Sequence, residues 1–470
     1  ADNIDAGTGN DVVYTSLAGL TEDTSIAGGT GNNTLAFNKP GEAGGWDNES
    51  YSAVSFNLST DLGNASDFHN IVGSNSDDTL TGDGAVNVII GGSGADTLSG
   101  GDGDDEIYGD YHTSDTSGNT YGYRQYGVSE GNDKLFGGGG DDKLVGNNGD
   151  DQFDGGTGAD TITTGSGSDT IVLRVGDGGN VITDADVVTD FTDGTDVLGL
   201  DNGLQYTDLT IAQGTGDNAS DTIISSGSEY LAILQGISSS NINYYDFVST
   251  ATGNQTLTGS SGDDVLLGAS GIDTVNSGTG VDIIVTYGGD DAITIDGIGS
   301  KTIDGGTGTN TLSINYLGLN GLSDFAVGAV STSDGASWTL TASNNDVITF
   351  KNIIDYTYTS GAAGYWDGYI TVASKTYRFV SDMRHDTSPF SGAYGSVQAF
   401  VYESGSTVEV VLSEGGKWLP QYRMSGYKDF AFDGSETFSI YGSSGSEVMF
   451  GGYQADVINA GGGNDFIFGG

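Results

Sequence analysis

The sequence is poorest in cysteine, proline and basic residues. It has no cysteine, three prolines, and 13 lysines and arginines against 65 aspartates and glutamates. The lack of cysteine excludes disulfides, zinc–thiolate sites and thiol catalysis. The formal net charge of −52 argues against a nucleic-acid partner, because phosphates would be repelled, and makes cations the expected partners.

Long apolar runs and common catalytic motifs are also missing. No run is long enough to cross a bilayer, so we expect no membrane span. The opening residues, ADNIDAGTGND, lack a basic stretch followed by an apolar one, and we expect no signal peptide within them. The motifs H-E-x-x-H and G-x-S-x-G are absent. His385 beside Arg384 is a candidate general base, but a surface ion cluster is the simpler interpretation, so we predict that the chain is not an enzyme.

Glycine and aspartate are abundant and recur with a period of nine residues. The stretch GGSGADTLSGGDGDDEIYG, from Gly91 to Gly109, contains two copies of G-G-x-G-x-D-x-U-x, where U is a large apolar residue. Residues 110–130 interrupt a first array, and a degenerate turn with Ser300 at the expected aspartate position interrupts a second. The sixth position falls on Asp11 and Asn33 in isolated copies, then on Asp78, Asn87, Asp96, Asp105, Asp133, Asp142, Asp151, Asp160 and Asp169, on Asp264, Asp273, Asp282, Asp291 and Asn310, and on Glu447, Asp456 and Asp465.

This pattern resembles the RTX (repeat-in-toxin, hemolysin-type) calcium-binding nonapeptide-repeat family over about residues 73–172, 255–313 and 439–470. The resemblance implies a parallel β-roll in which two nonapeptides make one coil, so that alternate repeats stack on the same edge. One edge would carry Asp133, Asp151 and Asp169, and the other Asp142 and Asp160. The apolar residues expected to point inward are Leu135, Leu144, Phe153, Ile162 and Ile171.

The chemistry of the repeat favours calcium. Glycine permits the tight and left-handed turns, aspartate is short enough to reach an ion from them, and hard oxygen ligands select calcium. Without the ion, stacked carboxylates would repel by ~1 kcal/mol per pair at ~4 Å in water and by ~4 kcal/mol at an effective dielectric near 20. The repeat provides only one inward-facing apolar residue per nonapeptide, and so small a core is not expected to offset that repulsion. We therefore predict that calcium binding supplies much of the folding free energy. The alternative is a solvated acidic face that needs no metal.

We therefore predict many calcium ions as cofactors. The predicted metal ligands are Asp11, Asp78, Asp96, Asp105, Asp133, Asp142, Asp151, Asp160, Asp169, Asp264, Asp273, Asp282, Asp291, Asp456 and Asp465. The uncharged Asn33, Asn87 and Asn310 should bind weakly or not at all. Glu447 is one methylene too long, and a gap is expected at Ser300.

The predicted fold is all-β: a parallel β-roll solenoid in two or more blocks, with an inserted antiparallel β-rich domain. Residues 314–438 hold three of the four tryptophans and seven of the 13 basic residues. The predicted divisions are residues 1–72 (degenerate repeats with a β insertion), 73–172 (first roll, with a loop at about 110–130), 173–254 (β-rich cap), 255–313 (second roll), 314–438 (aromatic-rich antiparallel insertion) and 439–470 (third roll segment).

Two segments between the arrays carry further candidates. The cap resembles the segment that follows the repeats in many RTX exoproteins, and Asp190, Asp193 and Asp196 could hold one more calcium or simply form turns. In residues 314–438, the Tyr365–Trp366–Asp367 cluster and Trp418 could stack on sugars or on a protein, although ordinary sheet packing explains them as well.

Three functions remain open from the sequence. The first is a calcium-loaded structural surface protein that self-associates as a layer, sheath or filament; the second is an adhesin segment that binds glycan or a cell surface through residues 314–438. The third is the non-catalytic carrier part of an exoenzyme. The chain starts at the fifth repeat position and stops at the second, which suggests either end-to-end stacking or a tandem architecture. The resemblance implies an extracellular location reached through type I secretion.

Overall fold

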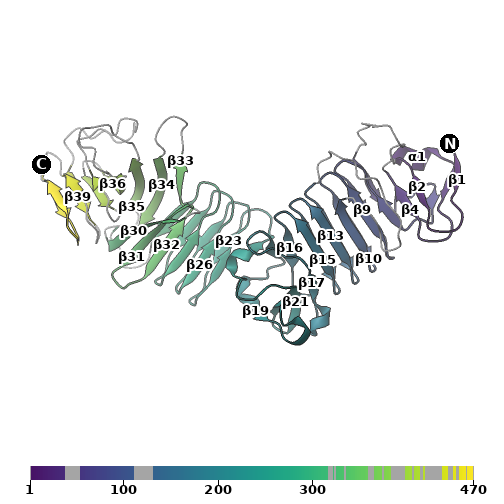
Figure 1. Cartoon of the computed structure of the whole chain (residues 1–470). Coiled ribbons are helices and arrows are strands. Elements are labelled where there is room, and N and C mark those ends of the chain that lie inside the picture. The colour runs from purple at the N-terminus through teal and green to yellow at the C-terminus, as the bar shows by residue number, and fades with distance from the viewer. Residues whose placement is uncertain are drawn as a thin grey trace. The chain divides into compact units, whose positions relative to one another are not determined.

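The computed structural model is built almost entirely of short strands that stack as successive rungs within each of two compact units, residues 1–250 and 251–470 (Figure 1). No helix in the described part of the chain is long and apolar enough to cross a membrane. The structure describes every residue except 1, 38–52, 111–130, 316–320, 322–323, 333–334, 358–364, 373–374, 383–396, 405–406, 413–416, 419–436, 443–447, 451–454, 462 and 469–470.

Two sheets form the roll of the first unit, and alternate strands of the chain go to alternate sheets. One sheet contains, in spatial order, β19 (Leu209–Gln213), β20 (Thr222–Ser226), β21 (Glu229–Leu234), β17 (Asp186–Val188), β15 (Thr161–Ser166), β13 (Lys143–Asn148), β11 (Glu106–Asp110), β9 (Val88–Gly92), β7 (Asn70–Val72), β4 (Thr34–Ala36) and β2 (Val12–Tyr14). The other contains β22 (Phe247–Ser249), β18 (Val197–Leu200), β16 (Thr170–Leu173), β14 (Gln152–Thr157), β12 (Lys134–Gly139), β10 (Thr97–Asp102), β8 (Thr79–Thr81) and β5 (Ser55–Asn57).

Smaller elements complete the first unit. A three-stranded sheet joins β1 (Asn3–Asp5), β3 (Ser25–Ala27) and β6 (Ala65–Ser66). The helical turns are α1 (Leu17–Glu22), η1 (Ile182–Asp184), η2 (Tyr206–Asp208), η3 (Gly216–Asn218) and η4 (Tyr244–Asp246).

The nine-residue period sets the register of the roll. Strands two repeats apart pair in parallel, so that Leu135 aligns with Phe153 and Leu144 with Ile162. All five apolar residues predicted to point inward, Leu135, Leu144, Phe153, Ile162 and Ile171, are fully buried. The predicted parallel β-roll is confirmed, and each nonapeptide of this array buries at least one large apolar residue, with Ile90 and Tyr108 buried in addition.

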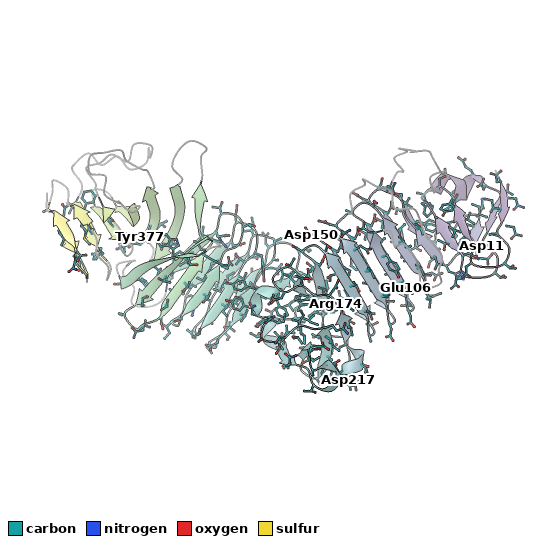
Figure 2. All side chains as sticks on the ribbon, viewed as in Figure 1. Asp11, Glu106, Asp150, Arg174, Asp217 and Tyr377 are labelled. Atoms are coloured by element: carbon teal, nitrogen blue, oxygen red, sulfur yellow. The ribbon has the colours of Figure 1, made fainter. Side chains whose placement is uncertain are left out.

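The predicted cap segment continues both sheets of the first unit and then changes direction. β17 and β18 pair in parallel with the roll, whereas β19, β20 and β21 pair with one another in antiparallel fashion. Beside them, the Arg174 guanidinium (labelled in Figure 2) contacts three carboxylates: Nη1 lies 2.9 Å from Asp154 Oδ1 and 3.1 Å from Asp177 Oδ2, and Nε lies 3.1 Å from Asp201 Oδ2. An arginine thus supplies positive charge where the regular repeats end.

The second unit also contains two principal sheets. One contains β23 (Thr256–Thr258), β25 (Thr274–Asn276), β27 (Ala292–Ile295), β29 (Thr311–Ile314), β34 (Tyr365–Val372), β35 (Lys375–Asp382), β36 (Val397–Ser404), β37 (Thr407–Leu412), β39 (Thr437–Tyr441) and β41 (Val457–Asn459), with β33 (Ile354–Thr357) beside β34. The other contains β24 (Val265–Leu267), β26 (Asp282–Val285), β28 (Lys301–Asp304), β32 (Val347–Lys351), β31 (Gly335–Ala342) and β30 (Phe325–Thr332). A third sheet joins β38 (Lys417–Trp418), β40 (Val448–Phe450) and β42 (Phe466–Phe468).

The antiparallel strands of the aromatic-rich segment extend the sheets of the roll. β29 pairs in parallel with β34, which begins the antiparallel series β34–β35–β36–β37, and β37 returns to parallel pairing with β39. Antiparallel pairing is therefore present in residues 314–438, within sheets shared with the nonapeptide strands. A separate inserted domain, like the other predicted divisions of the chain, stays a prediction.

Candidate metal centre

One repeat turn, residues 137–142, shows why the glycines are needed. A Cβ atom at Gly137 would collide with the Asp142 Oδ2 atom and with the Gly155 carbonyl oxygen. Gly138 and Gly140 have φ angles of +112° and +133°, which residues with a side chain rarely adopt. The glycines thus bring a carboxylate and turn carbonyl oxygens close together.

The aspartates form two rows linked by hydrogen bonds. The backbone N–H of each donates to the Oδ1 atom of the aspartate one coil later: Asp133 to Asp151 and Asp142 to Asp160, both at 2.8 Å. Asp151 donates in the same way to Asp169 at 2.8 Å. Alternate repeats therefore stack on the same edge and consecutive repeats on opposite edges, as predicted, and each of these aspartates is buried.

The second carboxylate oxygen is what gives these rows their chemistry. It is buried, and among the described residues it has no hydrogen-bond partner in several turns. These turns belong to Asp11, Asp96, Asp105, Asp133, Asp142, Asp151, Asp160 and Asp169 in the first unit and to Asp282 and Asp291 in the second. Of these, Asp282 Oδ2 lies 2.9 Å from the Lys301 Nζ atom. A buried carboxylate oxygen without a donor is costly, and a row of them requires protons or cations.

Burial and neighbouring carboxylates raise the pKa values of these aspartates. Burial is the largest cause, and it raises the pKa of Asp96 to about 9 and that of Asp133 to about 8, with like charges in the same row adding to the effect. The pKa values of Asp105 and Asp151 rise to about 7 for the same two reasons. Without a metal, the rows therefore hold protons more tightly than exposed carboxylates do.

The donor set of these turns fits calcium. Within the described residues, no three His, Cys, Asp or Glu side chains gather as a metal-binding group, so backbone carbonyl oxygens must complete any ion's shell. At Gly137 such a carbonyl, from Gly155, lies beside the Asp142 carboxylate. A shell of carboxylate and carbonyl oxygens suits a hard cation of calcium's size. A bound calcium would supply the positive charge that the Oδ2 atoms lack.

The residue at the second repeat position determines whether Oδ2 has a partner. Where that residue has positive φ, as at Gly138 and Gly156 (+91°), its N–H turns away and Oδ2 has no donor. Where it does not, the N–H donates to Oδ2. This occurs from Ser74 to Asp78 at 2.5 Å, from Ser260 to Asp264 at 2.6 Å and from Ala269 to Asp273 at 2.9 Å. These three predicted sites thus have a backbone donor already in place.

Two further aspartates continue the rows: Asp186, which the sequence analysis did not name, and Asp196, which it named as a possible ligand of a separate calcium. The Asp160 N–H donates to Asp186 Oδ1 at 3.0 Å, and the Asp169 N–H donates to Asp196 Oδ1 at 3.2 Å. Both acids begin the D-x-U pattern of the repeat, in DVV and DVL. Asp196 Oδ2 accepts from the Thr192 N–H at 2.7 Å, whereas Asp190 accepts from the Thr164 N–H at 2.8 Å. A calcium site made by Asp190, Asp193 and Asp196 stays a prediction.

The asparagine positions use an amide where other turns have a carboxylate. Asn310 Oδ1 keeps its place in the row, accepting from the Asp291 N–H at 3.0 Å, while Nδ2 donates to the carbonyl oxygens of Gly305 and Asn352 at 2.5 and 3.0 Å. Asn33 Nδ2 likewise donates to the Asp67 carbonyl at 3.0 Å, and Asn87 Nδ2 to the His69 carbonyl at 2.7 Å.

The expected gap at Ser300 was placed one residue too early. Strand pairing aligns Asp282 with Lys301, since the turn before Lys301 contains one additional residue. The sixth repeat position is therefore occupied by a lysine, and Ser300 precedes it.

The remaining predicted ligands of the second unit lie where the repeat places them. Asp273, Asp282 and Asp291 are buried, and the Asp273 N–H donates to Asp291 Oδ1 at 2.8 Å. Asp264 and Asp456 are half-buried, and Asp456 Oδ1 accepts from the Phe438 N–H at 2.9 Å. Asp465 is half-buried as well. Ion binding at each aspartate stays a prediction.

Several other candidates lie outside the part of the chain whose side chains are described. They are residues 111–130, His385, Glu447, the Tyr365–Trp366–Asp367 cluster and Trp418. Glycan binding through residues 314–438 therefore stays a prediction, as does the carrier function.

These features define a β-roll with carboxylate-lined turns, and the comparisons agree with that class. The family described as "RTX calcium-binding nonapeptide repeat (4 copies)" matches residues 1–17, 70–98, 81–110, 128–153, 145–180, 249–284, 267–294 and 441–470, together less than half of the chain. The chain thus contains RTX repeats, which bind calcium and are typical of extracellular proteins.

Two solved structures illustrate the similarity. The AlgE6R2 subunit of the Azotobacter vinelandii mannuronan C5-epimerase is 23% identical, with a TM-score of 0.19, over 39% of this chain and 93% of that one. The extracellular lipase LipA of Serratia marcescens is 17% identical, with a TM-score of 0.18, over 41% of this chain and 42% of that one. A search of curated proteins finds no match.

Proposed function

We propose that the chain is a structural protein of the extracellular space that folds when calcium fills its carboxylate rows and then assembles into a layer, sheath or filament. The observation that carries this proposal is the run of buried aspartates in the first array whose Oδ2 atoms have no donor among the described residues. Such rows make a rigid solenoid only when protons or metal cations neutralise them.

The location of folding follows from calcium affinity. Extracellular calcium modules bind with dissociation constants of about 0.1 to 1 mM. Cells keep little free calcium inside, so a chain with such affinity would stay unfolded before export and fold outside. Type I secretion, which the RTX resemblance implies, would carry it there.

Support for assembly comes from a second set of acids. The fifth repeat position often carries an exposed aspartate, beside the buried one at the sixth. These residues are Asp77, Asp104, Asp141, Asp150, Asp263 and Asp290. Exposed rows of carboxylates repel other copies of the chain in the absence of divalent ions and can be bridged by them.

The test is electron microscopy of the purified chain in millimolar calcium, in millimolar magnesium and in chelator. We expect ordered sheets or filaments only with calcium, because magnesium dehydrates reluctantly and tolerates irregular oxygen shells poorly. A matched variant, Asp104→Asn with Asp141→Asn, should fold normally and assemble less. Folded single particles in millimolar calcium, with an unfolded chain in chelator, would leave the calcium-binding role intact and refute the assembly role.

A further inference from the structure

Lys301 stands where the repeat pattern requires a calcium-ligating aspartate. The motif G-x-D at Gly280–Asp282 aligns with G-S-K at Gly299–Lys301. The following residues keep the repeat, because Ile284 and Ile303 pair in register and both are buried. The substitution therefore reverses the charge at one position without disturbing the coil.

The lysine ammonium lies among oxygen atoms. Its Nζ atom is 2.9 Å from Asp282 Oδ2 and donates to the Gly280 carbonyl oxygen at 2.6 Å. A longer hydrogen bond, 3.4 Å, joins it to the Ile298 carbonyl oxygen. Both side chains of the ion pair have 0% exposure, so water does not compete for these contacts. A carboxylate and two turn carbonyls around one positive charge resemble the donor set available to calcium in the other turns.

We propose that the Lys301 ammonium takes the place of a calcium ion beside Asp282, so that this one edge of the second roll closes at that position without metal. In the first array, Asp142 and Asp160 offer an Oδ2 atom that no described residue neutralises. At Asp282 the chain supplies the cation itself. A tethered ammonium also excludes a divalent ion from the same space through charge repulsion and volume.

The opposite edge of the same coil has an amide in place of one carboxylate. There Asn310 replaces aspartate, and its amide donates to the carbonyl oxygens of Gly305 and Asn352. The coil also adjoins a core cluster that includes Phe325, Trp338, Phe350 and Tyr377. The Oδ2 atom of Asp291 on this edge is buried and has no hydrogen-bond partner among the described residues, so the proposal concerns the Asp282 edge alone, and the adjacent core supplies apolar burial.

Hydrogen–deuterium exchange of the full chain tests the proposal locally. In excess chelator, we expect the amides of β26 and β28 to exchange at least about tenfold more slowly than those of β13 and β15, because native-state exchange reports local opening. Added calcium should slow exchange strongly in β13 and β15 and little in β26 and β28. Equal, rapid exchange of all four strands in chelator would overturn the proposal, and this arm needs no variant.

A pair of lysine variants provides the matched comparison. Lys301→Met removes the ammonium and keeps the chain length, whereas Lys351→Met removes a lysine that is paired at 2.9 Å with Asp304 and is 23% exposed. In chelator, Lys301→Met should speed exchange in β26 and β28 by about tenfold or more, since breaking a buried ion pair is strongly destabilising. Lys351→Met should do so much less. Equal effects of the two variants would contradict a specific role for Lys301.

The last experiment tests whether a variant at position 301 gains a calcium ion. Lys301→Asp restores the repeat sequence, and the variant should bind one calcium more than the unaltered chain when ions are counted by native mass spectrometry. An unchanged count in a folded Lys301→Asp chain would show that Lys301 is not what keeps calcium from this rung.

Discussion

At the residue scale, the chemistry of a turn depends on whether Oδ2 of its sixth-position aspartate has a donor. Asp151 and Asp273 are both buried and both accept a ladder hydrogen bond on Oδ1. They differ at Oδ2, which has no described partner in Asp151 but accepts from the Ala269 N–H in Asp273. The same residue type therefore has a different need for a cation in the two turns.

This difference predicts unequal effects of one substitution at two places. Asp151→Asn should cost about one bound calcium and about 3 kcal/mol of calcium-loaded stability, because it removes one partner of a buried ionic contact. Asp273→Asn should leave the number of bound ions nearly unchanged. Calcium titration calorimetry with thermal unfolding of both variants measures this, and equal losses would contradict the role given to the second repeat position.

The raised pKa values predict how protons compete with calcium. Burial, with like charges beside them, raises the pKa of Asp96 to about 9 and that of Asp133 to about 8. For a carboxyl whose folded pKa is raised, the metal-free fold is most stable below the unfolded pKa of about 4. That stability is lost as the pH rises through the folded values, up to about 9 for Asp96.

Calcium binding at pH 7 should therefore release protons, and affinity should fall as the pH is lowered. Calorimetry in two buffers with different ionisation enthalpies measures the release directly. Identical binding enthalpies in the two buffers would contradict the idea that protons occupy the carboxylate rows when the metal is absent.

At the element scale, the nine-residue period was enough to predict strands, register and inward-facing residues. The period fails where a turn changes length. One additional residue before β28 moved the expected aspartate position from Lys301 to Ser300, and counting from the apolar Ile303 instead would have found the lysine. The places of Asp186 and Asp196 in the rows were not predicted for a related reason, since cap residues separate them from the preceding repeats and only their D-x-U pattern remained as a signal.

The pairing of the aromatic-rich strands could not be predicted from sequence alone. Alternating apolar residues indicated strands in residues 314–438, but alternation does not say which sheet a strand joins. That choice depends on contacts between distant segments, such as β29 with β34 and β37 with β39. Likewise, an N–H donor to Oδ2 depends on the backbone angle at residues such as Ala269, and a repeat pattern does not contain that angle.

At the scale of the whole molecule, the two units differ in how they offset the repulsion among their acidic residues. The chain carries a formal charge of −52. The first array has a core of few large apolar residues and rows of carboxylates without described donors, so we expect calcium to be its main source of cohesion. The second unit adds an aromatic core, a buried lysine and an amide rung. We infer that its central coils need calcium less.

The most direct test is an anomalous-scattering map from crystals of the chain grown in millimolar calcium. Cations held by turn oxygens are the source of cohesion in this account, so peaks should lie beside the Oδ2 atoms of Asp142, Asp151 and Asp160. No peak should lie beside Asp282, where Lys301 already supplies the charge. An ordered roll without peaks at those three aspartates would contradict the account.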